Sequence, residues 1–299
     1  MKEGQIINAL SGFYDVQSEG KIYRCRGRGV FRNKKVSPLV GDFVEFEETN
    51  ENEGYIMSIQ TRRNQFKRPS IANITQAIIV SSAVEPEFSP LLVDRFLVLL
   101  EAEDIEPIIV ISKKDVATSS QLEEIQAFQT VYEKLGYQII LTSFDAEQQE
   151  EETENINQLL AMLSNHVTVL VGQSGVGKSS FLNQLDPSLN LKTADISTSL
   201  GRGKHTTRQI ALWEIAGGLV ADTPGFSNLE FSDIKAENLD ECFVEIRELK
   251  PFCKFRSCQH IKEPQCAVKQ AVEEGNIATF RYEHYQTFLK EILSRKPRY

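Results

Sequence analysis

A glycine-rich stretch in the second half of the chain has the residues and spacing of a phosphate-binding loop. It matches the pattern G-x-x-x-x-G-K-[ST] through Gly172, Gln173, Ser174, Gly175, Val176, Gly177, Lys178 and Ser179. A β-branched run at 167–171 precedes it, and a helix-compatible run from Ser180 follows it. In that context backbone N–H groups bind phosphate oxygens, Lys178 reaches the β- and γ-phosphates and Ser179 ligates Mg²⁺. We include Ser180 in the predicted site. The alternative is a glycine-rich strand–helix turn without a ligand, and the flanking strand and helix favour the phosphate loop.

A second motif, D-x-x-G, lies about fifty residues downstream and runs from Asp222 to Gly225. An apolar run at 219–221 precedes it, so Asp222 falls at the end of a predicted strand. A carboxylate there can hold Mg²⁺ through water, and the Gly225 N–H can sense a γ-phosphate. Alone the motif is common and usually a turn, but downstream of a phosphate loop it indicates a nucleotide site.

Base recognition is predicted upstream of the phosphate loop. After the apolar run 108–111, a motif of the type Asn/Thr-Lys-x-Asp is formed by Ser112, Lys113, Lys114 and Asp115. An Asp carboxylate accepts hydrogen bonds from guanine N1–H and the 2-amino group, donors that adenine lacks there. Serine replaces the usual Asn or Thr, and its hydroxyl keeps a local hydrogen bond available. Alone the motif could also be a helix-start loop.

Thr142 and Ser143 follow the next apolar run, 138–141, where a second guanine-contacting loop would lie. Two strand-end motifs in the right mutual order together favour guanine.

Near the C-terminus, three cysteines and one histidine lie within fourteen residues, namely Cys253, Cys258, His260 and Cys266. Three thiolates and one imidazole form the ligand set of a closed, structural Zn²⁺ site. A disulfide would leave one thiol unpaired, and an iron–sulfur site matches this ligand set less well. The remaining two cysteines, Cys25 and Cys242, are predicted to be ordinary buried or half-buried thiols.

Composition places these motifs in a folded globular protein. The chain has 299 residues, 41% hydrophobic and 25% charged, with 33 basic and 42 acidic side chains and a net charge of −9. No apolar run approaches the ~18 residues that cross a bilayer, and the N-terminus lacks an apolar signal core. The sequence therefore predicts a cytoplasmic protein without a membrane partner, and nothing in it suggests more than a monomer.

The negative charge is concentrated in the middle of the chain. Residues 1–70 have a net charge of +3, residues 71–160 of −13 and residues 161–299 of +1. The acidic run 147–152 is expected to be a solvated loop or a helix start. The total charge of the chain therefore does not exclude a nucleic-acid partner for either end.

Patterning divides the chain into three parts. Residues 1–65 contain about five short strands, which fit a small barrel such as an OB-fold or another SH3-like barrel. From residue 76, β-branched runs alternate with helical stretches at 91–102, 121–135 and 155–163, which predicts a mostly parallel sheet covered by helices. Residues 234–295 are predicted to be mainly helical.

The order of the motifs carries a family resemblance. The guanine motifs precede the phosphate loop and D-x-x-G follows it, which is a circular permutation of the GTPase order. With the barrel and the Cys/His cluster, the chain closely resembles the bacterial small ribosomal subunit biogenesis GTPases of the RsgA type over essentially its whole length. The resemblance implies an all-β OB-fold RNA-binding domain at 1–66, an α/β circularly permuted P-loop GTPase domain at 67–230 and a mainly α zinc-binding domain at 231–299.

The resemblance also implies GTP hydrolysis to GDP and phosphate, stimulated by the small (30S) subunit late in its maturation. The cofactors would be one structural Zn²⁺ and Mg²⁺ with GTP, and the partner the subunit with its rRNA. Two other functions stay open from the motifs alone. One is a P-loop ATPase or small-molecule kinase in which Asp115 is incidental, and the other is a non-catalytic RNA-binding scaffold.

The segment between the phosphate loop and D-x-x-G is predicted to be a switch. A threonine hydroxyl there can close over Mg²⁺ and the γ-phosphate, and we choose Thr207, with Thr206 as the rival. Phe226 occupies the place of the glutamine that orients water in many GTPases. His205 is therefore the candidate to position the attacking water, as the resemblance supports; the alternative is a loop histidine that contacts RNA or nothing.

Basic residues suggest RNA contacts at both ends of the chain. Residues 21–35 hold seven basic residues together with Tyr23 and Phe31, which fits phosphate contacts and base stacking, although a solvated strand face is the alternative. Further phosphate contacts are predicted for Arg281, Lys290, Arg295, Lys296 and Arg298. These groups suggest a clamp on rRNA that is engaged with GTP and released with GDP, with the barrel and the zinc domain as its two grips.

Overall fold

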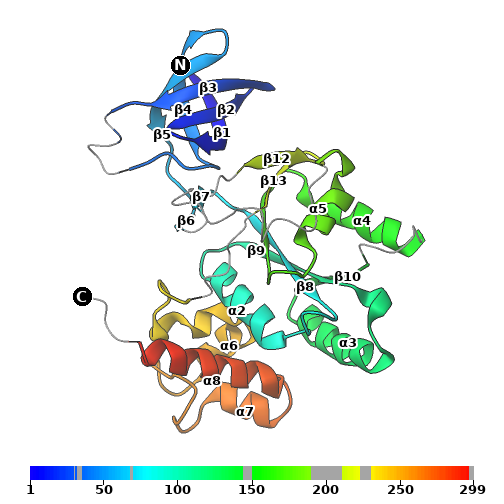
Figure 1. Ribbon diagram of the computed structural model, residues 1–299. Helices are drawn as coiled ribbons and strands as arrows, with labels where there is room; N and C mark the ends of the chain where they lie inside the picture. Colours follow the sequence, from blue (N-terminus) through cyan, green and yellow to red (C-terminus); the bar gives the residue numbers. More distant parts are fainter. Residues whose placement is uncertain are drawn as a thin grey trace. The chain divides into compact units, whose positions relative to one another are not determined.

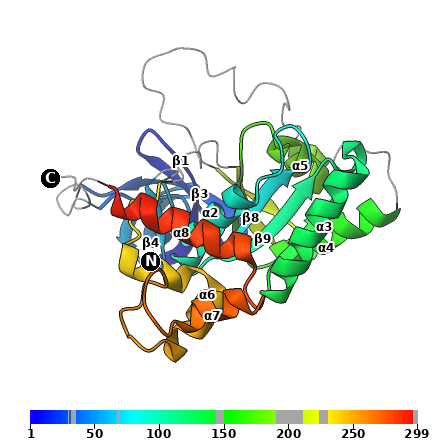
Figure 2. The same cartoon turned by 90° about the horizontal axis from the view of Figure 1, so that it is seen from below.

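The computed structural model describes residues 1–29, 31, 36–67, 70–143, 150–189, 211–222 and 230–295, with the side chains of 67, 150, 151 and 222 left aside (Figures 1 and 2). The chain forms two compact units, each built from two separate stretches. Unit 1 comprises Met1–Val80 and Thr142–Asn228, and unit 2 comprises Ser81–Leu141 and Leu229–Tyr299. The three-domain boundaries derived from the sequence stay a prediction.

The N-terminal part of unit 1 is a closed five-stranded barrel (Figure 1). Its strands are β1 (Lys2–Leu10), β2 (Phe13–Ser18), β3 (Lys21–Gly27), β4 (Phe43–Asn50) and β5 (Glu53–Ile59). They close in the order β1-β2-β3-β5-β4, with β3 and β5 parallel and the other neighbouring pairs antiparallel. Alternating residues fill the interior, among them Ile6, Val16, Val44, Phe46 and Ile56. The predicted small barrel is thus confirmed.

A short hairpin, β6 (Gln65–Lys67) and β7 (Ser70–Ala72), follows the barrel. Two asparagines fix its ends. The Asn64 amide group donates to the Ile74 carbonyl at 2.8 Å and accepts from the Ile74 N–H at 2.9 Å. Asn73 Nδ2 donates to the carbonyl of Gly41, in the β3–β4 connection of the barrel, at 3.0 Å. Side-chain hydrogen bonds therefore hold the linker to the barrel within unit 1.

A six-stranded sheet follows, with the order β10-β9-β8-β11-β13-β12. Its strands are β8 (Gln76–Ser82), β9 (Glu106–Ser112), β10 (Gln138–Leu141), β11 (Val167–Val171), β12 (Leu212–Ile215) and β13 (Gly218–Asp222). β11 is buried along its whole length and pairs in parallel with β8 and β13, whereas β12 is antiparallel to β13. The apolar runs at 108–111, 138–141, 167–171 and 219–221 thus form β9, β10, β11 and β13, and the predicted mostly parallel sheet is confirmed. The strand before the phosphate loop thus lies between one strand from upstream and one from downstream, as a permuted GTPase requires.

Helices flank the strands as the pattern predicted: α2 (Pro90–Glu101), α3 (Ser119–Lys134), α4 (Glu150–Leu163) and α5 (Lys178–Leu185), with 3₁₀ turns η1 (Lys114–Val116) and η2 (Pro187–Leu189). Ser89 caps α2 with Pro90 in its first turn, and Thr118 and Gln121 form a capping box at the start of α3. These caps explain why both helices begin within three residues of the predicted starts.

The C-terminal part of unit 2 is mainly helical, as predicted. It contains η3 (Ala236–Asn238), η4 (Asp240–Cys242), α6 (Val244–Leu249), η5 (Lys250–Phe252), α7 (Ala267–Glu273) and α8 (Thr279–Leu293). Their core includes Phe231, Phe243, Ile246 and Phe288 and extends to Val98 of α2. α2 and α8 lie side by side in both views (Figures 1 and 2). Within the described ranges, we find no helix with the length and apolar character needed to span a bilayer.

Candidate nucleotide site and metal centre

The phosphate loop connects β11 to α5 in the predicted strand–loop–helix context. Gly172 has a φ of +146°, and a Cβ built on it would lie 2.1 Å from the Val80 carbonyl oxygen, so only glycine fits. Gly177 is the N-cap of α5 with a φ of +94°, and Val176 is buried. Because the first N–H groups of a helix have no partner within it, this loop directs backbone donors toward its mouth.

Lys178 lies across this loop. Its Nζ donates to the carbonyls of Gly172 at 2.9 Å and Gln173 at 2.6 Å, and the side chain is half-buried. The ammonium group is therefore held by loop carbonyls beside the backbone N–H groups. Ser179 and Ser180 follow in the first turn of α5, also half-buried. The geometry suits an anion at the helix N-terminus with a lysine beside it.

The predicted guanine motif begins at the end of β9 in unit 2. Ser112 is buried, and its hydroxyl donates to the Ser81 carbonyl at 3.0 Å, which is the local bond expected of it. Lys113 adopts a left-handed conformation with a φ of +63°, and its Nζ donates to the Glu85 carbonyl at 2.5 Å. Lys114 and Asp115 lie in η1, with Asp115 exposed. Two side-chain hydrogen bonds thus hold the strand end, and the residue that would bind the base is exposed.

Thr142 and Ser143, which follow β10, are fixed by an acidic side chain from α4. Glu152 Oε2 accepts hydrogen bonds from the Thr142 hydroxyl at 2.5 Å and from the Ser143 N–H at 3.1 Å. The acidic run does include a helix start, since α4 begins at Glu150. Of the two alternatives for this run, the structure thus bears out the helix start, and Glu152 within it is only 4% exposed because its carboxylate accepts these two hydrogen bonds.

The Cys/His cluster is assembled in unit 2 between η5 and α7. Its four ligand atoms all lie within 4.8 Å of one another. His260 Nδ1 lies 3.6 Å from Cys253 Sγ and 3.3 Å from Cys266 Sγ, and the two sulfurs are 3.9 Å apart. Tetrahedral zinc with Zn–S of about 2.3 Å and Zn–N of about 2.0 Å requires ligand separations of roughly 3.5–3.8 Å. The residues present therefore fit a zinc ion.

Polar groups outside the four ligands orient the cluster. Asp240 Oδ2 lies 3.6 Å from His260 Nε2 and 2.7 Å from Lys250 Nζ. The His260 ring thus has the Asp240 carboxylate on its Nε2 side and two cysteine sulfurs on its Nδ1 side. Glu263 accepts backbone N–H groups from Gln259, Ile261 and Lys262 at 2.9–3.0 Å and so closes the loop. The sequence motif did not reveal Asp240 or Glu263, because neither is in the ligand pattern.

Burial raises the pKa of the Cys258 thiol to about 12 and also raises the pKa of Cys266. Without a metal these thiols are protonated at neutral pH, so binding of a cation at the cluster displaces their protons. Cys25 and Cys242 are not among the four ligands and are both buried, as predicted.

Comparison with known proteins decides the family. The sequence model described as RsgA GTPase matches residues 59–232, and that of the RsgA N-terminal domain matches residues 3–56. The chain belongs to the RsgA GTPase family. It is 57% identical to "Small ribosomal subunit biogenesis GTPase RsgA 2" of Oceanobacillus iheyensis and 55% identical to "Small ribosomal subunit biogenesis GTPase RsgA" of Bacillus cytotoxicus, each over 100% of both chains.

Solved structures agree with this RsgA assignment. "The crystal structure of YloQ, a circularly permuted GTPase" has a TM-score of 0.84 and 47% identity, covering 100% of this chain and 97% of that one. YjeQ from Thermotoga maritima has a TM-score of 0.86 and 35% identity, covering 99% of each chain. Membership of the RsgA family thus supports GTP hydrolysis and the permuted fold over the ATPase and scaffold alternatives.

Several predicted RsgA site residues lie outside the described residues: His205, Thr206, Thr207, Gly225 and Phe226. Asp222 is the last residue of β13, and its backbone is in register with Leu170 of β11. The strand-end position predicted for it is therefore confirmed. Its role stays a prediction.

Two predictions about RNA contacts are wrong. Tyr23 is 4% exposed and Phe31 is also buried, because strand alternation turns Tyr23 inward and its arginine neighbours outward. Arg281 is 1% exposed and hydrogen-bonds Asp94 and Glu245, so it offers no surface for phosphate. The basic residues of β3 that remain exposed are Lys21, Arg24 and Arg26, and the two arginines lie over the Phe13 ring.

Proposed function

We propose that this chain hydrolyses GTP on the small ribosomal subunit and assists the late maturation of that subunit. The observation that carries the proposal is the phosphate loop, with its glycine-only turn and with Lys178 over its carbonyls. The relatives that match the chain along its whole length are named for biogenesis of this subunit. We further propose that it acts in the cytoplasm as a monomer, with the subunit, its rRNA and GTP/GDP as partners.

The phosphate end of GTP would be held by residues Gly172 to Ser180 of the loop. Backbone N–H groups bind the oxygens, and Lys178 neutralises the charge that develops on the β- and γ-phosphates. Mg²⁺ would be held by Ser179, Thr207 and Asp222, and it supplies further neutralisation of the phosphate oxygens. The Gly225 N–H would report the presence of the γ-phosphate.

The guanine base would be recognised by two strand ends. Asp115 accepts from guanine N1–H and the 2-amino group, with Ser112, Lys113 and Lys114 shaping its loop, and Thr142 and Ser143 form the second contact. The buried hydrogen bonds of Ser112 and Thr142 support this assignment, because they hold both loops in one conformation before the base arrives.

His205 would orient the attacking water, since Phe226 has no group that can do so. We expect slow turnover by the free protein and faster turnover on the subunit, which orders the water-positioning loop. The barrel and the zinc module would act as two grips on rRNA, engaged with GTP and released with GDP. Zn²⁺ held by Cys253, Cys258, His260 and Cys266 would keep the second grip rigid.

Steady-state GTP hydrolysis, measured as purified small subunits are added, tests this function. Turnover should rise with subunit concentration, and the Lys178→Ala variant should stay near background at every concentration. Subunit affinity should be higher with a non-hydrolysable GTP analogue than with GDP. Equal turnover with and without subunits would contradict ribosome-dependent catalysis, and equal affinities would contradict the clamp.

A further inference from the structure

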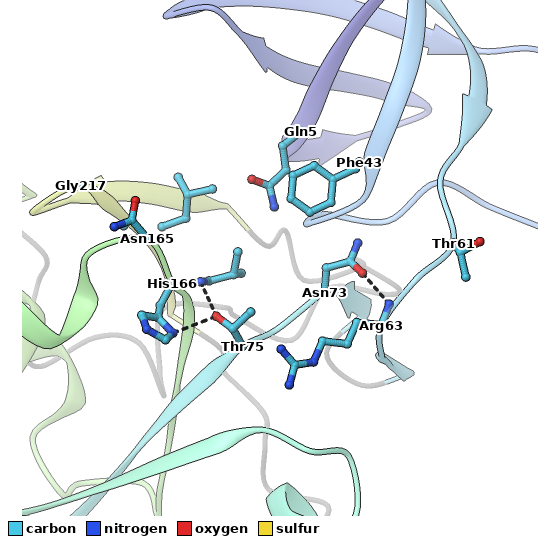
Figure 3. A pocket seen from close by; sticks show the side chains of 12 residues that line it. Gln5, Phe43, Thr61, Arg63, Asn73, Thr75, Asn165, His166 and Gly217 are labelled. Carbon is cyan, nitrogen blue, oxygen red and sulfur yellow. Dashed lines mark hydrogen bonds between the residues drawn. The ribbon is translucent and has the colours of Figure 1, made fainter.

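A cavity of about 410 Å³ lies in unit 1, beside the barrel and away from the phosphate loop (Figure 3). Its twelve lining residues come from the barrel, from the linker around β6 and β7, and from the segments that lead into β11 and β13. The volume falls within the usual range for small-molecule sites, about 300–1,000 Å³. No function assigned above uses this space.

The lining combines an aromatic ring, an arginine guanidinium and a histidine imidazole. Phe43 is 44% exposed, which is unusual for a phenylalanine, and Figure 3 shows its ring beside Gln5 above the cavity. Arg63 and His166 line the cavity below it. Of the described residues that form the lining, none is acidic. Such a lining favours a flat, negatively charged ligand.

Hydrogen bonds hold the walls in place. Asn73 accepts from the Arg63 N–H at 2.9 Å and donates to the Gly41 carbonyl, which also accepts from Gln5 Nε2 at 3.2 Å. The Thr75 hydroxyl accepts from the Val167 N–H at 2.9 Å and lies 3.2 Å from His166 Nδ1 (Figure 3). A wall fixed in this way needs little ordering when a ligand enters, which favours affinity.

We propose that this cavity binds one nucleotide unit, with its unpaired base against the Phe43 ring and its phosphate at Arg63. Base–aromatic stacking tolerates every base, so the site would select an unpaired nucleotide and not a sequence. The net charge of +3 over residues 1–70 suits an RNA strand that continues past the cavity. The inference rests on the proposed function for its RNA source, and a free nucleoside monophosphate shares the same chemistry.

The test measures binding to the full chain with its GTP site saturated by a non-hydrolysable GTP analogue. The probes are a fluorescently labelled single-stranded RNA hexamer and, separately, a set of nucleoside monophosphates. Phe43→Ala should weaken binding roughly five- to hundredfold, and Phe43→Leu should weaken it less, because apolar contact remains without the aromatic face. Arg63→Gln should reduce the slope of log affinity against log salt by about 0.7, the value for one phosphate contact on a single strand.

Thr61→Trp fills the cavity from its exposed rim without deleting a wall hydrogen bond, so it keeps the test decisive if Phe43→Ala folds poorly. Leu10→Ala is the matched control, an exposed apolar residue at the end of β1 that does not line the cavity. It should bind both probes like the unaltered chain. Circular dichroism of each variant reports whether it is folded.

The outcomes separate the sources and the two proposals. If the cavity variants lose RNA binding but still bind monophosphates, the cavity binds a nucleotide within an RNA strand. If they lose binding of both probes, the cavity binds a single nucleotide from either source. Unchanged binding of both probes in Phe43→Ala, Arg63→Gln and Thr61→Trp overturns the inference, as does tighter binding of an acidic peptide than of RNA. If small subunits fail to stimulate GTP hydrolysis, the proposed function fails independently of the cavity.

Discussion

Arg281 of α8 lies at the centre of a buried ionic cluster that joins the C-terminal helices to α2. Its guanidinium donates to Asp94 Oδ1 at 2.5 Å and, through two nitrogens, to both carboxylate oxygens of Glu245 at 2.7 and 2.9 Å. The Tyr132 hydroxyl also donates to Asp94, and His284 Nδ1 lies 2.6 Å from the other Asp94 oxygen. Asp94 is fully buried and Glu245 nearly so, which makes the arginine their main counter-charge.

Replacing Arg281 with methionine keeps most of the side-chain volume and leaves two buried carboxylates. Breaking a buried ion pair by removing one partner costs about 3–5 kcal/mol. The triple variant Asp94→Asn, Glu245→Gln, Arg281→Met removes all three charges, and the amide oxygen that replaces the Asp94 carboxylate can still accept from Tyr132. Because neutral replacement of a whole buried ionic group is often close to neutral, the triple variant should recover most of the loss.

Amide hydrogen exchange along α8 measures this locally. Trp213 is the single tryptophan and lies in β12 of unit 1, so its fluorescence follows the other unit. A loss of 3–5 kcal/mol corresponds to exchange roughly a hundred- to several-thousandfold faster. Lys235→Met is the control, since the Lys235–Glu237 pair is exposed and should contribute about 0–1 kcal/mol. A change below tenfold in Arg281→Met, or a triple variant as destabilised as the single one, would refute the reasoning.

Three further predictions address recognition of the guanine base, the zinc site and the stability of α8 at low pH. Asp115→Asn should sharply lower kcat/KM for GTP and raise it for xanthosine triphosphate, because an amide donates where the carboxylate accepted; unchanged preference would contradict guanine recognition by Asp115. Elemental analysis should find one zinc per chain, and His260→Ala should lose that zinc and the protection of the 253–266 loop from proteolysis; full zinc retention would exclude His260 as a ligand. A hydrogen bond from Arg95 lowers the pKa of Glu291 below its usual 4.5, so its stabilisation is complete above that pH and is lost as the pH falls through the lowered pKa. Glu291→Gln should therefore flatten the acid-induced loss of α8 protection, and an identical acid profile would argue against this carboxylate.

Features whose residues lie close together in the sequence could be predicted. The phosphate loop and the Cys/His ligands each lie within fourteen residues, so spacing alone indicates them. The strands could be placed because β-branched runs are local as well. Strand alternation was also available for β3, and it would have placed Tyr23 and Arg24 on opposite faces. The prediction that Tyr23 and the arginines share one RNA-binding surface did not take this two-residue alternation into account.

Features that depend on distant partners were not predictable. Arg281 looked like a surface cation because its acceptors lie 187 and 36 residues away, on α2 and α6. The burial of Glu152 did not follow from the acidic run, because its donors directly follow β10, across the segment before α4. Asp240 and Glu263 support the zinc ligands from outside their spacing pattern. In each case a tertiary contact reverses what the local charge pattern favours.

In the permuted chain, the phosphate loop and the predicted guanine motif belong to different compact units. The phosphate loop belongs to the same compact unit as the barrel, to which the Asn73–Gly41 hydrogen bond fastens the linker. The predicted guanine motif follows β9 in the other unit, where α2, which leads into β9, is held to α8 by Asp94 and Arg281. Loosening the barrel linker should therefore act first on phosphate recognition, whereas loosening the α2–α8 contact should act first on the choice of base. An Arg281→Met variant that lost its preference for GTP over xanthosine triphosphate with intact phosphate affinity would show that this ionic cluster, far from the Asp115 carboxylate in sequence, positions the base-reading loop.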